Sequence, residues 1–229
     1  MKKLIIIALL LTAGTTFAQV NYQLSSAVDF VRTYKIASGE YYSELSEKDI
    51  LGSAFLNQEF INGSVYTTTK FQYTDIPLRY NIFNDNIEFK TPENKILAIA
   101  APETIDKITF GDYTMEYLSY MNVKKVRKGY MLLITKGKAS LYAKPEVIYK
   151  KATEAGAYKE PEPAKFERRS DIFYIRIETA SAQRIDNKKD LLQVFPDHQN
   201  DMEAFVKKNK ISPAKIDELK SVIEYYNSL

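Results

Sequence analysis

The chain has 229 residues, of which 45% are hydrophobic, 27% charged and 13% aromatic. This composition is typical of a globular protein and excludes disordered, collagen-like and multi-span membrane classes. The sequence contains no cysteine and one histidine, which excludes disulfides, thiolate metal sites, iron–sulfur clusters and a thiol nucleophile. A chain of this length buries about 70% of its unfolded surface, so it needs no covalent cross-link to fold.

Residues 1–18 have the pattern of a secretory signal peptide. Two lysines precede the apolar run 4–11, and residues 16–18 (Thr-Phe-Ala) supply small side chains at the positions that a signal peptidase reads. The apolar run is about half the length of a membrane span, so we expect cleavage before Gln19 rather than anchoring. The predicted localisation is the periplasm, with the cell surface or the medium as alternatives, and no later span is expected.

Charge is distributed unevenly along the remaining chain. Residues 19–123 carry 8 basic and 14 acidic side chains, whereas residues 124–229 carry 22 and 15. The densest basic run comprises Lys124, Lys125, Arg127, Lys128, Lys136 and Lys138. This run predicts either docking of an envelope protein, an anionic glycan or a lipid phosphate, or the solvated face of a hairpin. We expect no nucleic-acid partner, because the exported chain would be nearly neutral overall.

From about residue 52 to residue 150 the sequence is typical of an antiparallel β meander. Turn signals recur about every 10 to 20 residues, which is denser than βαβ units allow. The predicted turns are Asn62-Gly63, Asn84-Asp85, 91–94, Gly111-Asp112, Lys128-Gly129 and Lys136-Gly137. The predicted strands are 65–73, 78–83, 86–90, 96–100, 113–121, 130–135 and 139–149. We therefore expect a β-rich body over residues 19–153, built as a barrel, a sandwich or a single curved sheet.

Residues 154–165 form a composition break after this body. Two prolines lie two residues apart in it, which precludes a helix and favours an extended connector. The last predicted unit, residues 166–229, begins with a β-hairpin whose strands are expected at 171–178 and 182–185.

The rest of this unit has helical periodicity. Three short amphipathic helices are predicted, the first capped by Asn187, the second by Asp197 and the third opened by Ser212-Pro213. The apolar stripe of the third helix comprises Ile216, Leu219, Val222, Ile223 and Tyr226. A single helical turn is also predicted at 45–51. The predicted fold class is α+β, with a predominantly antiparallel β meander and a C-terminal three-helix segment.

No catalytic motif is found: the sequence has no GxGxxG, Walker loop, HExxH, EF-hand loop or GxSxG. We expect no cofactor, no metal site and no catalytic residue, and we interpret His198 as an exposed residue at a helix start. Glu88, Asp75 and Asp112 lie near strand ends or turns and are the acids that a glycoside hydrolase would use. Acids at such positions are more often turn formers.

Tyrosine is unusually frequent, with 17 residues. Its strand propensity accounts for this number if the rings stand outward on a sheet. Alternatively, tyrosines near Arg79 and Tyr80, in the segment 75–81, form a recognition surface.

Five segments together resemble one protein family. They are 52–57 (GSAFLN), 76–81 (IPLRYN), 88–89 (EF), 190–195 (DLLQVF) and 223–227 (IEYYN). With these segments the chain resembles a family of uncharacterised exported proteins of Bacteroidota, over nearly all of the mature sequence. The resemblance implies an envelope location and a β-rich body with a helical tail, and it implies no activity, ligand or catalytic residue.

Three functional hypotheses follow from the sequence. The first is a non-catalytic envelope protein that docks another macromolecule. The second is a binder of a small ligand or glycan in a tyrosine-lined groove. The third is a hydrolase that uses carboxylates.

Overall fold

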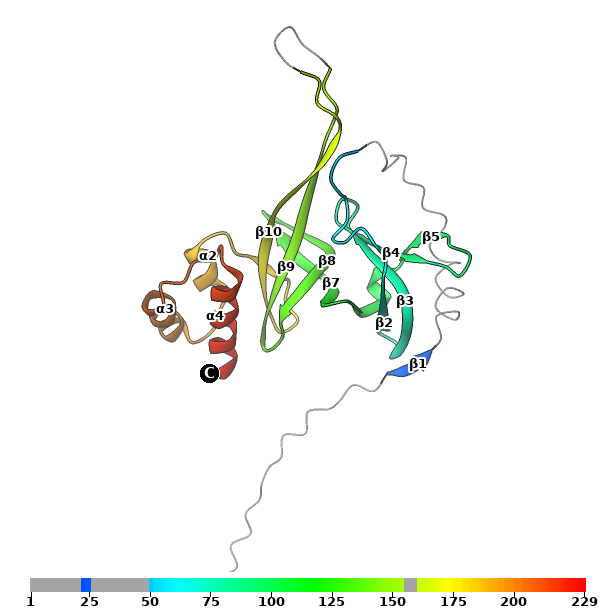
Figure 1. The fold of residues 1–229 in the computed structure, drawn as a ribbon. Coiled ribbons are helices and arrows are strands. Elements are labelled where there is room, and N and C mark those ends of the chain that lie inside the picture. The colour runs from blue at the N-terminus through cyan, green and yellow to red at the C-terminus, as the bar shows by residue number, and fades with distance from the viewer. Residues whose placement is uncertain (1–21, 26–49, 155–159) are drawn as a thin grey trace, which may run out of the picture.

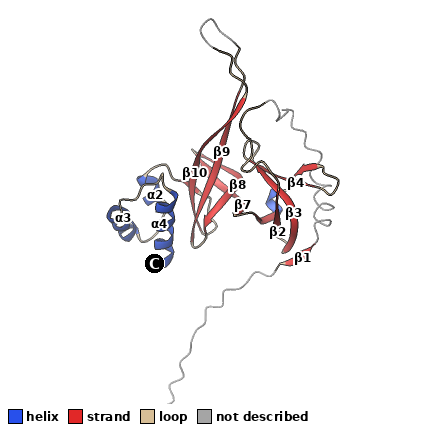
Figure 2. Cartoon of the chain, viewed as in Figure 1, coloured by secondary structure: helices blue, strands red, loops and turns tan. Residues whose placement is uncertain are grey.

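The computed structural model describes residues 22–25, 50–154 and 160–229. In this part of the chain the backbone forms a curled antiparallel half-barrel sheet, and three α-helices follow it at the C-terminal end (Figures 1 and 2). The predicted α+β class is therefore confirmed, and the sheet is curved rather than a sandwich. The predicted signal peptide lies outside the described residues, as does all but the end of the helical turn expected at 45–51.

Neighbouring strands lie in the order β11-β10-β9-β8-β7-β6-β2-β3-β4-β5 within the described sheet. The short strand β1 adds in parallel to the edge of β3, and every other pairing of named strands is antiparallel. The bounds are β1 Gln23–Ser25, β2 Ile61–Thr67, β3 Phe71–Asn81, β4 Asn86–Lys90, β5 Ile96–Ala98, β6 Ile105–Phe110, β7 Tyr113–Asn122, β8 Lys125–Thr135, β9 Ala139–Lys150, β10 Lys165–Ile177 and β11 Gln183–Arg184.

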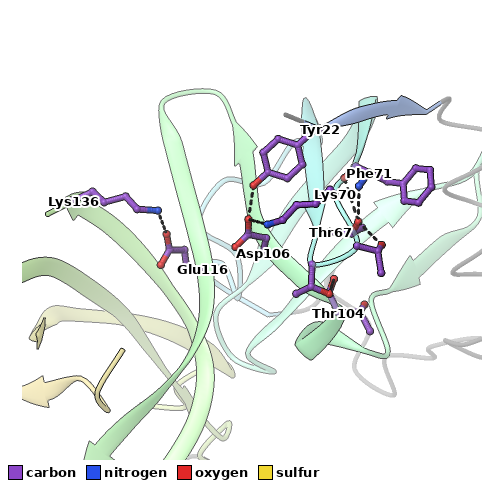
Figure 3. A network of polar contacts seen from close by, with 10 residues as sticks. Tyr22, Thr67, Lys70, Phe71, Thr104, Asp106, Glu116 and Lys136 are labelled. Atoms are coloured by element: carbon purple, nitrogen blue, oxygen red, sulfur yellow. Dashed lines mark hydrogen bonds and ion pairs between the residues drawn. The ribbon is translucent and has the colours of Figure 1, made fainter. Parts of the chain in front are cut away.

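Tyr22 fixes the start of β1 to the body of the sheet. Its hydroxyl donates a hydrogen bond to Asp106, which also lies 3.7 Å from the ammonium of Lys70 (Figure 3). The Tyr22 ring packs edge-on against Tyr66, with 4.8 Å between the ring centroids. These contacts hold the first described segment against the β2–β6 region.

Two of the six predicted turns are wrong, and both contain a glycine that lies inside a strand. Gly63 belongs to β2, and the chain turns at residues 68–70 instead, which divides the predicted strand 65–73 between β2 and β3. A Cβ atom on Gly63 would lie 2.2 Å from the carbonyl oxygen of Thr109, so the close approach of β6 requires glycine. Gly129 likewise lies inside β8, whose hairpin turn with β7 is at residues 123–124. The other four predicted turns are confirmed.

Of the segment 154–165, expected to be a connector, the structure describes residues 154 and 160–165, which lie at the end of the long β9–β10 hairpin. Strands β9 and β10 pair along almost their whole length, and a further bridge joins Thr153 to Glu162. This hairpin projects beyond the rest of the sheet (Figure 1).

The three predicted helices exist as α2 (Lys188–Gln193), α3 (Gln199–Lys208) and α4 (Ile216–Ser228). Asn187 caps α2 as predicted, because its side-chain oxygen accepts hydrogen bonds from the first-turn backbone N–H groups. Asp197 does not cap α3: His198 occupies that position, and Asp197 accepts hydrogen bonds from Tyr226 and Lys138. Helix α4 begins at Ile216, after the predicted start at Ser212-Pro213.

Helix α4 packs on β8 and β9, α3 packs on α4, and the apolar faces of the three helices share one buried cluster with residues of β9 and β10. The predicted stripe of α4 is confirmed at four positions that are at most 2% exposed, and Ile216 is partly exposed. These four residues are Leu219, Val222, Ile223 and Tyr226. Asn227 fixes α4 to β9: its amide oxygen accepts from the backbone N–H of Ala139 (2.8 Å) and its amide nitrogen donates to the carbonyl of Ala139 (2.9 Å).

The C-terminal strands curl into a ring of their own. After β10, the chain crosses to β7, where the backbone of Ala182 exchanges hydrogen bonds with Ser119 and Met121, each 2.9 Å long. Strands β7, β8, β9, β10 and the segment 182–184 thus enclose a small barrel. Its interior is aromatic and apolar, and contains Leu118, Tyr120, Met131, Tyr142, Tyr174 and Ala182.

No helix in the described ranges is long and apolar enough to cross a membrane.

Candidate docking hairpin and tyrosine pocket

The six cations of the predicted basic run do not form one patch. Lys136 and Lys138 lie at the β8–β9 turn, at the opposite end of β8 from the other four. The ammonium of Lys136 is 3.2 Å from Glu116 (Figure 3), and that of Lys138 is 2.8 Å from Asp197. The charges of both lysines are therefore balanced by neighbouring carboxylates, and neither lysine belongs to the candidate docking site.

The other four cations surround the turn of the β7–β8 hairpin, and we call residues 123–128 the basic tip. Lys124, Lys125, Arg127 and Lys128 are all exposed. None of these four forms an ion pair with another residue of the described ranges, and no acidic residue occurs between Glu116 and Glu146. The basic tip therefore presents four uncompensated positive charges in six residues.

Two valines lie among these charges. Val123 is 86% exposed and Val126 is 61% exposed, which makes them two of the most exposed large hydrophobic side chains in the described chain. Val123 also has a φ of 58°, in the left-handed region that a β-branched residue adopts only with strain. A two-residue hairpin turn favours glycine or asparagine at a positive φ, so local stability does not explain valine here.

Behind the basic tip, β8 and β9 separate, and two side chains fill the gap. The pairing of these strands ends at Leu132 and Ala143, so Tyr130 lacks a backbone partner on that side. The side chain of Asp85, from the β3–β4 turn, accepts a hydrogen bond from the backbone N–H of Tyr130 (3.3 Å). The ammonium of Lys144 donates a hydrogen bond to the backbone carbonyl of Tyr130 (3.2 Å). Asp85 and Lys144 are also 3.0 Å apart.

Gly129 provides the space for this ion pair. A Cβ atom there would lie 2.4 Å from the Asp85 carboxylate and 3.0 Å from the Lys144 ammonium. The bonds of Asp85 tie the N-terminal half of the sheet to the small barrel, because they cross from the β3–β4 turn to β8 and β9.

A pocket opens at the mouth of the small barrel, beside Lys144. Its volume is about 230 Å³. It is lined by residues of β7, β9, β10 and β11, namely Tyr120, Asn122, Lys144, Pro145, Glu146, Ile172, Tyr174 and Arg184. The pocket adjoins the basic tip, because Tyr120 pairs with Arg127 across the β7–β8 ladder and Asn122 pairs with Lys125.

Tyr120 and Tyr174 are the buried part of this pocket. They are 6% and 2% exposed, and their rings meet edge to face with centroids 5.3 Å apart. Burial, more than any other influence, raises the pKa of Tyr174 to about 12, while the guanidinium of Arg184 acts in the opposite direction. Burial and then the Asp85 carboxylate raise the pKa of Tyr120 as well. Both phenols are therefore neutral at physiological pH and can donate or accept hydrogen bonds.

Arg79 and Tyr80, the other predicted binding residues, have structural partners. The guanidinium of Arg79 donates to Glu88 at 2.6 Å and 3.2 Å and lies 3.4 Å from the centroid of the Phe55 ring. Tyr80 is fully buried and donates its hydroxyl to Asp85 (2.7 Å). Arg79 faces a second hollow of about 360 Å³, whose walls include Phe55 and Phe60.

The three acids of the hydrolase hypothesis do not converge. The oxygens of Glu88 accept hydrogen bonds from Arg79 and from Asn81 (2.9 Å), whereas Asp75 and Asp112 are exposed at a strand irregularity and a turn. His198 is 38% exposed, at the start of α3.

None of the residues that line the pocket is among the site residues predicted from the sequence. Asn122, Lys144, Tyr174 and Arg184 were not predicted as site residues, and the only available signal was the high tyrosine content. These side chains meet because of strand register, which spacing along the chain does not reveal. Comparison of the chain with protein-family models, with curated proteins and with solved structures finds no match.

Proposed function

We propose that this chain is an exported, non-catalytic envelope protein that docks onto an anionic membrane surface through its basic tip. The observation that carries the proposal is the combination of two exposed valines with four uncompensated cations on one hairpin turn. Apolar side chains enter the boundary between headgroups and acyl chains, while neighbouring cations attract anionic headgroups. A soluble anionic polysaccharide would use the charges but would give exposed valines no apolar phase.

The strain at Val123 supports the same conclusion. A positive φ costs a β-branched residue about 1 to 3 kcal/mol, and glycine would remove that cost. A residue that is both strained and 86% exposed contributes nothing to the packing of this protein. It does provide the most protruding apolar group of the basic tip.

The expected strength of docking follows from the charges. Each Lys or Arg near an anionic surface contributes about 1 kcal/mol, so the four cations supply about 4 kcal/mol, or roughly a thousandfold in partition coefficient. Screening reduces this contribution steeply, because the Debye length falls from about 10 Å at 0.1 M salt to about 3 Å at 1 M.

The test measures binding to sedimented vesicles. It compares the full chain with a tip variant, in which Lys124, Lys125, Arg127 and Lys128 are changed to Gln. Vesicles of phosphatidylcholine with phosphatidylglycerol are compared with vesicles of phosphatidylcholine alone. The control variant changes Lys189, Lys207, Lys208 and Lys210 to Gln, which removes the same charge from exposed positions in α2, in α3 and in the turn after α3. All three chains share residues 1–21, so any difference between them belongs to the substituted side chains.

We expect the full chain and the control variant to bind the anionic vesicles in a salt-sensitive manner, and the tip variant to bind at least about a hundredfold more weakly. Val123→Gly should weaken binding while raising the free energy of unfolding by about 1 kcal/mol. Equal binding of the tip and control variants would overturn the proposal. So would retention of the chain on immobilised polygalacturonate without any binding to vesicles.

A further inference from the structure

Three buried tyrosines in this protein donate their hydroxyl to a carboxylate. Tyr80 donates to Asp85 and Tyr142 donates to Glu116, each at 2.7 Å, and Tyr226 donates to Asp197. This pattern satisfies the polar end of a large aromatic side chain in an interior that lacks tryptophan.

Tyr120 and Tyr174 depart from this pattern. Both are more than nine-tenths buried, yet neither hydroxyl has a hydrogen-bond partner in the ranges that the structure describes. Both residues line the 230 Å³ pocket at the mouth of the small barrel. Neither hydroxyl is completely buried, so both open into the pocket, where a ligand can take the place of water as their hydrogen-bond partner.

The other lining groups offer both donors and acceptors to the same space. Arg184 uses its Nε to bind Asp186 (2.7 Å), and Lys144 binds Asp85. The side chains of Asn122 and Glu146 have no hydrogen-bond partner in the described part of the chain. The two cations, Lys144 and Arg184, face three acids, namely Glu146 of the lining and the paired Asp85 and Asp186. The net charge around the pocket is therefore slightly negative, and the pocket itself does not favour an anion.

We infer that this pocket binds one neutral sugar ring. A sugar hydroxyl donates and accepts hydrogen bonds at once, and this mixture of phenol, amide, carboxylate and guanidinium groups can meet several such hydroxyls together. The volume is below the roughly 300 to 1,000 Å³ of sites for drug-sized ligands, which fits a single ring rather than an oligosaccharide. The inference is independent of membrane docking, since it rests on the barrel interior and not on the basic tip.

The test is titration of the full chain with glucose, galactose, N-acetylglucosamine and glucuronate, followed by NMR chemical shifts and calorimetry. Two variants, Tyr120→Phe and Tyr174→Phe, remove only the hydroxyls. The matched control is Tyr142→Phe, which removes a hydroxyl from the same barrel that is bonded to Glu116 and lies outside the pocket lining.

We expect millimolar binding of at least one neutral sugar, weakened about tenfold by each pocket variant, with no loss of thermal stability. Tyr142→Phe should lower thermal stability and leave sugar binding unchanged, because its hydroxyl has a structural partner. The tip variant with four Gln substitutions should also bind the sugar normally, which separates this inference from membrane docking. The inference is overturned if no neutral sugar binds at up to about 50 mM, if only glucuronate binds, or if the pocket variants bind as well as the full chain.

Discussion

The attachment of the last helix to the sheet depends on one side chain, Asn227. Both of its hydrogen bonds go to the backbone of Ala139, which is completely buried. Asn227→Ala would leave a buried N–H and a buried C=O without partners, and each orphaned group costs about 1 to 3 kcal/mol. We expect the free energy of unfolding to fall by about 2 to 4 kcal/mol, a large part of the roughly 5 to 15 kcal/mol that stabilises a domain.

A neighbouring glycine provides an independent way to break the same contact. A Cβ atom on Gly137 would lie 2.1 Å from the amide nitrogen of Asn227, so Gly137→Ala displaces this side chain from Ala139. The double variant should therefore be no less stable than the worse of the two single variants. Ser228→Ala is the control, because its hydroxyl bonds only to the exposed carbonyl of Tyr225, and we expect a change within about 0.5 kcal/mol.

The assay is equilibrium urea unfolding followed by circular dichroism, with all four variants measured under the same conditions. A cost below about 0.5 kcal/mol for Asn227→Ala would show that water or a shifted helix end satisfies the Ala139 backbone. Additive effects of the Gly137 and Asn227 substitutions would show that the two act through different contacts. Either result would refute the reasoning.

Two further predictions concern buried polar groups. Arg79→Met leaves the Glu88 carboxylate buried beside Asn81 without its cation, so we expect a loss of about 3 to 5 kcal/mol in urea unfolding, and a smaller loss when Glu88→Leu is added. The pKa of Tyr174 is raised from 10.0 to about 12, so its contribution to stability is present below pH 10 and is lost as the pH rises toward 12. The melting temperature of the full chain should therefore fall more steeply between these pH values than that of Tyr174→Phe, and parallel curves would contradict this assignment.

Local signals predicted much of the fold. Asn84-Asp85 and Gly111-Asp112 are hairpin turns, and Asn187 caps a helix, because each of these features depends on a few consecutive residues. Gly63 and Gly129 misled the prediction for the opposite reason. Each is glycine because a group distant in sequence comes close to it, namely Thr109 in the first case and Asp85 with Lys144 in the second.

The tyrosines show the same limit. Strand propensity explains why they lie on strands, but the expectation that they stand outward is wrong for the five that are fully buried. These five are Tyr80, Tyr130, Tyr142, Tyr174 and Tyr226. For Tyr80, Tyr142 and Tyr226 the hydroxyl is satisfied by a carboxylate from another part of the fold, and the identity of that carboxylate depends on register that composition does not encode.

The basic tip begins where β7 ends, and β7 also contributes Tyr120 and Asn122 to the tyrosine pocket. Tyr120 precedes Val123 by three residues of an extended chain, which corresponds to about 10 Å. A membrane in contact with the tip would therefore bring its headgroups to the mouth of the pocket. Four cations with two valines suit an anionic lipid surface, while a slightly acidic pocket with two unpartnered phenols among the described residues suits a neutral sugar. A membrane component that carries both an anionic group and a sugar ring is thus one kind of ligand that would reach both features.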